Sequence, residues 1–126
     1  ELTLDYNRIE FLEPFLFQEL SSLKRLYLSN NLIKFLNENS FSGLSNLEYL
    51  NLNENNIRIV KNSFDCLKSL TNLYFTNNNL NYLSISENSK LSHIYLDNNP
   101  NLILKIDKKI NKIQHLSLKN VSNYTI

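Results

Sequence analysis

Several kinds of residue that enzymes and metal sites need are scarce in this chain of 126 residues. It contains one Gly, one Cys, two His and no Trp or Met. A single glycine excludes a phosphate-binding glycine loop, and a single cysteine excludes a Cys-x-x-Cys pair. No motif places a base beside a nucleophile, as covalent catalysis requires. We therefore expect no enzyme activity, no cofactor and no small-molecule substrate.

A strong charge of one sign and a long apolar run are also lacking. The formal net charge is +1, which gives no reason to expect a nucleic-acid partner. No apolar run approaches the length of a membrane span, and no signal-peptide pattern stands at the start. Any membrane attachment is therefore expected only through parts of a longer protein. The charges are uneven, however, with five acids in residues 1–20 and five lysines in residues 101–119, which is typical of solvated faces.

Leucine, asparagine and phenylalanine recur at fixed intervals along the chain. Residues 23–46 follow the template LxxLxLxxNxIxxLxxxxFxxL, and the pattern starts again at Leu47. The apolar residues of LxxLxL alternate as one face of a short strand does. One such unit cannot close a core by itself, and self-similarity at a fixed period predicts a solenoid of stacked units. The repeats span about 1–22, 23–46, 47–69, 70–90, 91–112 and 113–126.

With five copies in phase and Asn at the ninth place, the chain resembles the leucine-rich repeat family over essentially its whole length. The 24-residue form with Phe two-thirds of the way along is similar to the typical extracellular class, which includes Toll-like receptor ectodomains and secreted insect immune proteins. The resemblance implies an α/β solenoid, with a curved parallel sheet on the concave side and loops and short helical turns on the convex side.

The resemblance also implies a function and a location. It implies an extracellular protein, secreted or the ectodomain of a membrane protein, that binds another protein in innate-immune recognition. A cell-adhesion or guidance repeat protein is one alternative, and a structural arm used for assembly is another. The extracellular family normally has cysteine-rich caps, which this chain lacks. We therefore expect either a segment of a longer protein or a partner chain that covers the ends.

Most recurring residues are expected to be structural. Parallel strands need a long return path, and a return path wider than the strand curves the stack. Ile106 and Ile110, four residues apart, predict a helical turn on this outer path. The recurrent Asn is expected to satisfy backbone groups in the turns, and the recurrent Phe to form an outer spine. The Asn residues are Asn7, Asn31, Asn55, Asn78 and Asn99, and the Phe residues are Phe17, Phe41 and Phe64.

Positions between the strand leucines point to the concave side, and tyrosine recurs there. Tyrosine offers a large rigid contact area with a polar tip, which suits protein recognition, although it is also a good strand residue. The side chains of Tyr49 and Tyr74 are expected to point away from the core, so truncating either one is expected to leave the fold nearly unchanged. The expected protein-binding residues are Arg25, Tyr27, Tyr49, Asn51, Asn72, Tyr74, His93, Tyr95, Asp97 and His115.

Two histidines occupy the same template place in adjacent repeats. We expect His93 and His115 to lie about 5 Å apart at Cβ, which is the spacing of paired strands. Two imidazoles so placed are able to share a metal or to sense acid pH. Only Asp97 offers a third ligand of a suitable type, so we expect ordinary surface residues and no metal site.

Two weaker signals concern modification. Asn120 and Asn123 each begin a match to the N-glycosylation acceptor. With 23 Asn and 18 Ser or Thr in the chain, two such matches arise by chance, so both are candidates only. Cys66 lies on the return path, where a partly buried free thiol is the default and an intermolecular disulfide is the alternative.

Overall fold

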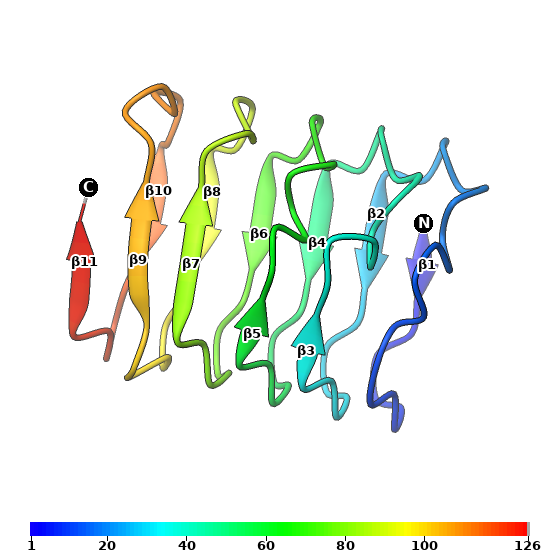
Figure 1. Ribbon diagram of the computed structural model, residues 1–126, viewed down its shortest axis with the longest axis horizontal. Helices are drawn as coiled ribbons and strands as arrows, with labels where there is room; N and C mark the ends of the chain where they lie inside the picture. Colours follow the sequence, from blue (N-terminus) through cyan, green and yellow to red (C-terminus); the bar gives the residue numbers. More distant parts are fainter. Residues whose placement is uncertain (126) are drawn as a thin grey trace.

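The computed structural model of the chain describes residues 1–125, which form a stack of six parallel coils (Figure 1). One short strand from each repeat joins a six-stranded parallel sheet in the order β1-β2-β4-β6-β8-β10. We call its outer surface the sheet face, which is the side predicted to be concave. The strands are β1 (Leu2–Thr3), β2 (Arg25–Tyr27), β4 (Tyr49–Asn51), β6 (Asn72–Tyr74), β8 (His93–Tyr95) and β10 (His115–Ser117).

The strands pair in the register that the template predicts. Leu26 lies opposite Leu50, and the same column continues through Leu73, Ile94 and Leu116. The middle residue of β2, β4, β6 and β8 is buried, while its two neighbours are more exposed. This period-two alternation is what a half-buried strand requires. The predicted solenoid is therefore confirmed.

The return path is extended rather than helical. It forms a two-stranded parallel sheet, β3-β5, and a three-stranded one, β11-β9-β7, which lie in front of the inner sheet in Figure 1. We call their outer surface the return face. No helix occurs in residues 1–125, so that part of the chain has none that could cross a membrane. The strands are β3 (Phe35–Leu36), β5 (Ile59–Val60), β7 (Tyr82–Ile85), β9 (Ile103–Ile106) and β11 (Asn123–Thr125).

The prediction of helical turns on the convex side is therefore wrong, and this includes the helical turn predicted from Ile106 and Ile110. Ile106 ends β9, whose residues alternate between exposed and buried, and Ile110 follows a turn. Both isoleucines are buried against the core. The four-residue spacing arises because a strand and the following turn both present an apolar side chain inward, which mimics one turn of a helix.

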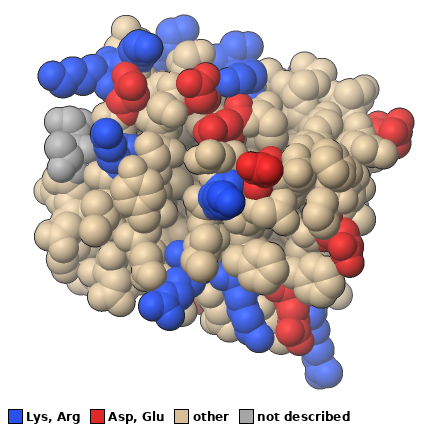
Figure 2. Space-filling model, in the orientation of Figure 1, with Lys and Arg blue, Asp and Glu red and all other residues tan. Residues whose placement is uncertain are grey.

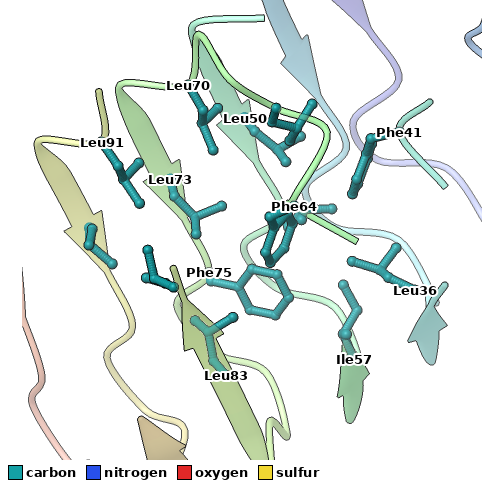
Figure 3. Packing of buried hydrophobic residues seen from close by; sticks show 14 of the residues in the cluster. Leu36, Phe41, Leu50, Ile57, Phe64, Leu70, Leu73, Phe75, Leu83 and Leu91 are labelled. Atoms are coloured by element: carbon teal, nitrogen blue, oxygen red, sulfur yellow. The ribbon is translucent and has the colours of Figure 1, made fainter. Parts of the chain in front are cut away.

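The core is one continuous cluster between the two layers, and its aromatic part is shown in Figure 3. Phe41 and Phe64 are stacked with ring centroids 5.9 Å apart, which confirms that part of the predicted spine. Phe17 is buried in the same core. Phe75 then meets Phe64 edge-on at 5.9 Å, although it comes from the strand side of its repeat. The spine therefore continues into a repeat whose return path has no phenylalanine.

Buried Asn side chains join neighbouring repeats at the turn after each inner strand. Each side-chain oxygen accepts a hydrogen bond of 3.0–3.1 Å from a backbone N–H of the preceding repeat. Each side-chain nitrogen donates to a backbone carbonyl of that repeat over 2.8–3.0 Å. These residues are Asn31, Asn55, Asn78 and Asn99. Their predicted structural role is confirmed, whereas Asn7 is exposed and bonds only within its own turn.

A second asparagine position accounts for more of the unusual composition. The residue before each ladder position adopts a left-handed backbone conformation, with φ between 55° and 57°. Asn enters this region more readily than most residues, because its short polar side chain can bond locally. The residues at this position are Tyr6, Asn30, Glu54, Asn77, Asn98 and Asn120. Asparagine therefore recurs in adjacent places for two different physical reasons.

Candidate functional site

Four tyrosines and one histidine form an unbroken stack of rings along the sheet face. Consecutive ring centroids lie 4.6–5.1 Å apart, within the range of favourable aromatic pairs. The stack crosses five adjacent strands, from β2 to β10. We call it the aromatic row, and its members are Tyr27, Tyr49, Tyr74, Tyr95 and His115. Sequence reasoning placed these residues on one surface but did not predict that their rings touch.

The aromatic row does not follow one column of the sheet. Tyr49 is the first residue of β4, whereas Tyr27 and Tyr74 are the last residues of β2 and β6. In register, Asn51 lies between Tyr27 and Tyr74, so the Tyr49 ring leans over this short side chain to meet both neighbours. His115 leans over Ser117 onto Tyr95 in the same way. Small polar residues at two positions therefore allow the stack to close.

Packing within the aromatic row changes the chemistry of one of its tyrosines, Tyr49. Burial, followed by the proximity of Tyr74, raises the pKa of Tyr49 to about 12. Its phenol therefore stays neutral further into the alkaline range than an ordinary tyrosine, and the neutral phenol can both donate and accept a hydrogen bond. The side chains from Tyr27 to Tyr95 are half-buried rather than freely exposed. The row thus presents ordered ring edges and hydroxyls rather than mobile side chains.

The two histidines lie side by side, as their template place predicts. His93 pairs with His115 across β8 and β10, and the rings are stacked with centroids 6.3 Å apart. His93 Nδ1 lies 2.9 Å from the Ser92 hydroxyl. No group of three or more His, Cys, Asp or Glu that could hold a metal ion occurs within residues 1–125. His115 also contacts the Tyr95 ring, at 4.8 Å between centroids, and so ends the aromatic row.

The remaining predicted binding residues differ in how firmly they are held. Arg25 is exposed, with its guanidinium 3.8 Å from the Glu1 carboxylate. Asn51 accepts a hydrogen bond from the Asn53 backbone N–H, at 3.0 Å. Asn72 accepts one from the Thr71 hydroxyl, at 2.8 Å. These contacts keep both amides at the sheet face, and a role for all three residues in binding stays a prediction.

Asp97 has a structural contact that its sequence position did not reveal. Its Oδ1 accepts hydrogen bonds from the Ser117 hydroxyl at 2.7 Å and from the Lys119 backbone N–H at 2.8 Å. In the same manner, Asp5 Oδ1 accepts a hydrogen bond from the Ser29 backbone N–H, at 2.6 Å. Since these bonds run between equivalent places in neighbouring repeats, Asp97 fixes the end of the last inner strand as well as lying beside the aromatic row.

The candidate modification sites lie near the C-terminal end of the described chain. Asn120 is exposed, and its side-chain nitrogen donates to the Asn98 side-chain oxygen at 2.6 Å. Asn123 is exposed at the start of β11. Cys66 is a free, half-buried thiol, and burial raises its pKa. A raised pKa keeps the thiol protonated and slows its oxidation.

The return face carries a feature that sequence reasoning missed. One large apolar side chain in each of five repeats is exposed, directly before a residue that packs on the core. We call this set the apolar stripe, and its members are Phe11, Phe35, Ile59, Tyr82 and Ile103. The signal in the sequence is a pair of adjacent apolar residues, such as Phe35-Leu36, where an alternating strand needs only one.

Comparison with known proteins gives one family. Two overlapping matches to the family model described as leucine rich repeat cover residues 1–57 and 36–80, and together they span more than half of the 126 residues. A comparison with curated proteins found no match. The matched region includes four inner strands, β1, β2, β4 and β6, and the buried ladder residues Asn31, Asn55 and Asn78. On the family match and the stacked parallel coils together, the chain belongs to the leucine-rich repeat family.

Proposed function

We propose that this chain binds another protein through the aromatic row on its sheet face. Repeats of this family generally serve as protein-interaction modules rather than as enzymes. The observation that carries the proposal is the unbroken contact between five rings on adjacent strands. Aromatic side chains held in place before binding lose little conformational freedom when a partner arrives, so more of the contact energy appears as affinity.

The geometry favours a partner that lies across the strands. The aromatic row runs along the stacking direction, so a segment placed across β2 to β10 meets every ring in turn. Tyr49 and Tyr74 lie in the middle repeats and therefore fall near the centre of such a contact. Residues at the centre of an interface exclude water best and contribute most of the affinity.

The experiment compares the two faces. The chain is immobilised and screened against purified secreted and cell-surface proteins, and Tyr74→Ala and Tyr49→Ala are then tested on any binder found. Each change is expected to weaken binding by roughly 30-fold, which corresponds to about 2 kcal/mol. Tyr82→Ala, on the return face, is the matched control and is expected to leave affinity unchanged. Affinity that falls with Tyr82→Ala but not with Tyr74→Ala would overturn the proposal.

The setting that we propose is extracellular, in the ectodomain of an innate-immune recognition receptor. Support comes from the 24-residue repeats with a recurrent Phe, which resemble the typical extracellular class, and from the stacked pair Phe41 and Phe64. A membrane-impermeant label applied to intact cells that express the full-length protein tests this location. Labelling of the surface protein, or its recovery from the medium, is the expected result. Protection of all copies from the label until the cells are lysed would contradict the proposal.

The two alternatives give different outcomes in the same binding screen. A cell-adhesion or guidance protein would also bind through the aromatic row, but its partner would be an adhesion or guidance molecule on another cell. A structural arm would bind through its ends or its return face, and affinity would then be insensitive to both Tyr49→Ala and Tyr74→Ala. The aromatic row suits immune and adhesive recognition equally, so the identity of the binder decides between them.

A further inference from the structure

The apolar stripe is too regular to be a set of isolated exposed residues. Its members follow one another at equivalent places in successive repeats, and each keeps between 48% and 58% of its surface exposed. Register confirms the alignment, because Phe35 lies opposite Ile59 on β3 and β5, and Tyr82 lies opposite Ile103 on β7 and β9. Contiguous exposed apolar surface on a soluble domain marks an interaction site far more often than single exposed residues do.

The core does not require these side chains. Each stripe residue precedes an inward-facing one, as Phe35 precedes buried Leu36 and Tyr82 precedes buried Leu83. Successive strand residues point to opposite faces, so a polar residue at the stripe position would leave the core intact. Nor do the aromatic stripe residues stack on each other among the described residues, unlike the rings of the sheet face. The stripe is therefore apolar surface without an internal function.

Opposite charges lie at the two ends of the stripe. Glu10 and Glu13 flank Phe11, whereas Lys105 follows Ile103 on β9, and all three charged side chains are exposed. Figure 2 shows the return face in the orientation of Figure 1, with Lys and Arg gathered at its upper left, where the chain turns after β9. Acids lie beside these cations as well as toward the right, and further Lys and Arg lie along the bottom. Uncharged surface covers much of the face between them. Beside the stripe itself, Glu13 therefore lies near the first member and Lys105 near the last, while Glu10 lies 3.7 Å from Lys34 of the next repeat.

A hollow interrupts the stripe near its centre. The sheet β3-β5 ends at β5, and β7 begins a separate sheet, so no strand pairing joins these two neighbours. A cavity of about 440 Å³ lies elsewhere, beside Ile110 and Leu116, but the hollow on the stripe has about 290 Å³. It is lined by Ile59 and Tyr82 with the polar residues around them. A large apolar side chain from another surface could enter it.

We propose that the return face binds a second copy of this chain, with the repeats of the two copies running in opposite order. The two-fold axis passes beside Ile59, parallel to the return strands. This arrangement places Phe35 of one copy opposite Tyr82 of the other, next to the hollow, and Phe11 opposite Ile103. The apolar stripes then cover each other along their whole length, which removes their exposed surface from water.

Charge selects this orientation over the alternative. With the repeats in opposite order, Glu13 of each copy lies over Lys105 of the other, which gives two complementary contacts. With the repeats in the same order, the acidic end would lie over the acidic end and the lysines over the lysines, which is unfavourable. Arg58 and Lys61, which line the hollow beside Ile59, each meet their own equivalent near the axis, and their long stems let the charged groups turn to solvent. The complementary contacts at the two ends of the stripe therefore set the orientation.

The area of the stripe sets the expected strength. Five repeats at a strand spacing of about 4.8 Å give a contact about 20 Å long, so the interface falls at the small end of the range for specific complexes. Small interfaces of this kind form weak, reversible dimers, with dissociation constants in the micromolar range or above. The dimer is therefore expected to depend on protein concentration and, because its ends are charged, to weaken as salt rises.

Sedimentation velocity of the chain over a range of concentrations tests the dimer. Ile59→Lys is expected to raise the dissociation constant at least tenfold, since it places two added charges together at the axis. Leu32→Lys, at an exposed apolar residue outside the stripe, is the matched control and is expected to leave the dimer intact. Thermal melts of both variants, expected to match the unchanged chain because both sites are exposed, show that the fold is retained.

Charge reversal tests the orientation. Glu13→Lys alone and Lys105→Glu alone are each expected to weaken the dimer about tenfold, because each change puts like charges together twice. A mixture of the two variants is expected to recover the dimer, since both contacts between unlike copies are again complementary. A monomer at every concentration, a dimer insensitive to Ile59→Lys, or assemblies that grow end to end beyond two copies would each overturn the proposal. Failure of the mixture to recover the dimer would overturn the opposite order of the repeats.

Discussion

The two faces of the solenoid carry large apolar or aromatic side chains at the same repeat interval, yet they differ in how these side chains are held. On the sheet face the rings touch, with centroids 4.6–5.1 Å apart, and they are half-buried. On the return face the equivalent row remains about half exposed. Repetition alone therefore brings side chains into line but does not pack them. Strand pairing and the size of the residues between them decide whether they pack.

The underlying sheets explain this difference. All six inner strands pair without interruption, so Tyr49, Tyr74 and Tyr95 each have a neighbouring ring on both sides. Short side chains at Asn51 and Ser117 leave room for Tyr49 and His115 to lean into the row. The outer strands divide into two sheets between β5 and β7, where the hollow lies. An ordered surface and an adaptable one thus arise from a single repeat.

The largest expected effect comes from the one glycine, which lies on the return path. Gly43 has φ of 94°, and a Cβ placed there would lie 2.3 Å from the Gln18 Cα of the preceding repeat. Gly43→Ala therefore combines left-handed strain with a backbone clash, and we expect a loss of about 2–5 kcal/mol of unfolding free energy. Urea unfolding followed by circular dichroism measures it.

Ser45→Ala, at an exposed position two residues away, is the control for Gly43→Ala and is expected to change the unfolding midpoint little. If both variants unfold at the same urea concentration, the close approach between the return paths of neighbouring repeats does not limit stability.

A somewhat smaller effect is expected where the two faces are joined. Asn55→Ala removes hydrogen bonds to the backbone of Leu28 and Ile33 in the preceding repeat. The buried Ile33 N–H is left unpaired, while the Leu28 carbonyl keeps only its bond from Asn31. We expect a loss of about 1–3 kcal/mol. Asn56→Ala changes the exposed neighbour and is expected to shift the midpoint by less than about 0.5 kcal/mol. Equal thermal midpoints for the two variants would contradict a structural role for the ladder.

The features that could be predicted from the sequence are those set by the repeat itself. Strand register, the buried Asn ladder and the stacked pair Phe41 and Phe64 follow from residues that recur at fixed places in several repeats. Features that depend on departures from the repeat could not be predicted. Phe75 fills the spine from the opposite layer, and the spacing of Ile106 and Ile110 reflects a strand with a turn rather than a helix.

The candidate site was predicted as a set of residues but not as an arrangement. Alternation places Tyr27, Tyr49 and Tyr74 on the sheet face, which the structure bears out in their positions. It does not give the lean of a ring across the neighbouring column, because that depends on side-chain size at Asn51. Likewise, the bonds from Ser117 and Lys119 to Asp97 depend on how two loops meet. Interactions between variable positions therefore need the structure.

The contrast between the faces can be measured directly with two tyrosines. Tyr74 contacts a ring on each side, so Tyr74→Ala is expected to lower the unfolding free energy by about 1–2 kcal/mol. This differs from the expectation drawn from its outward position alone. Tyr82, on the return face, is half exposed, and Tyr82→Ala is expected to cost less than about 0.5 kcal/mol. Equal losses would show that stacking along the aromatic row adds nothing to stability.

The last expected effect concerns the Tyr49 hydroxyl. It changes the unfolding free energy only under alkaline conditions and is therefore the smallest of these effects at neutral pH. Burial beside Tyr74 raises its pKa from 10.0 to about 12, so the folded chain keeps the proton that the unfolded chain releases. The resulting stabilisation is fully present below pH 10 and is lost as pH rises from 10 to about 12. Tyr49→Phe keeps the ring in the row but removes the titrating group. Urea unfolding of both proteins across this pH window is therefore expected to show a steeper loss of unfolding free energy for the unchanged chain than for Tyr49→Phe. Parallel curves of unfolding free energy against pH would show that the aromatic row does not hold the Tyr49 phenol in a less polar environment.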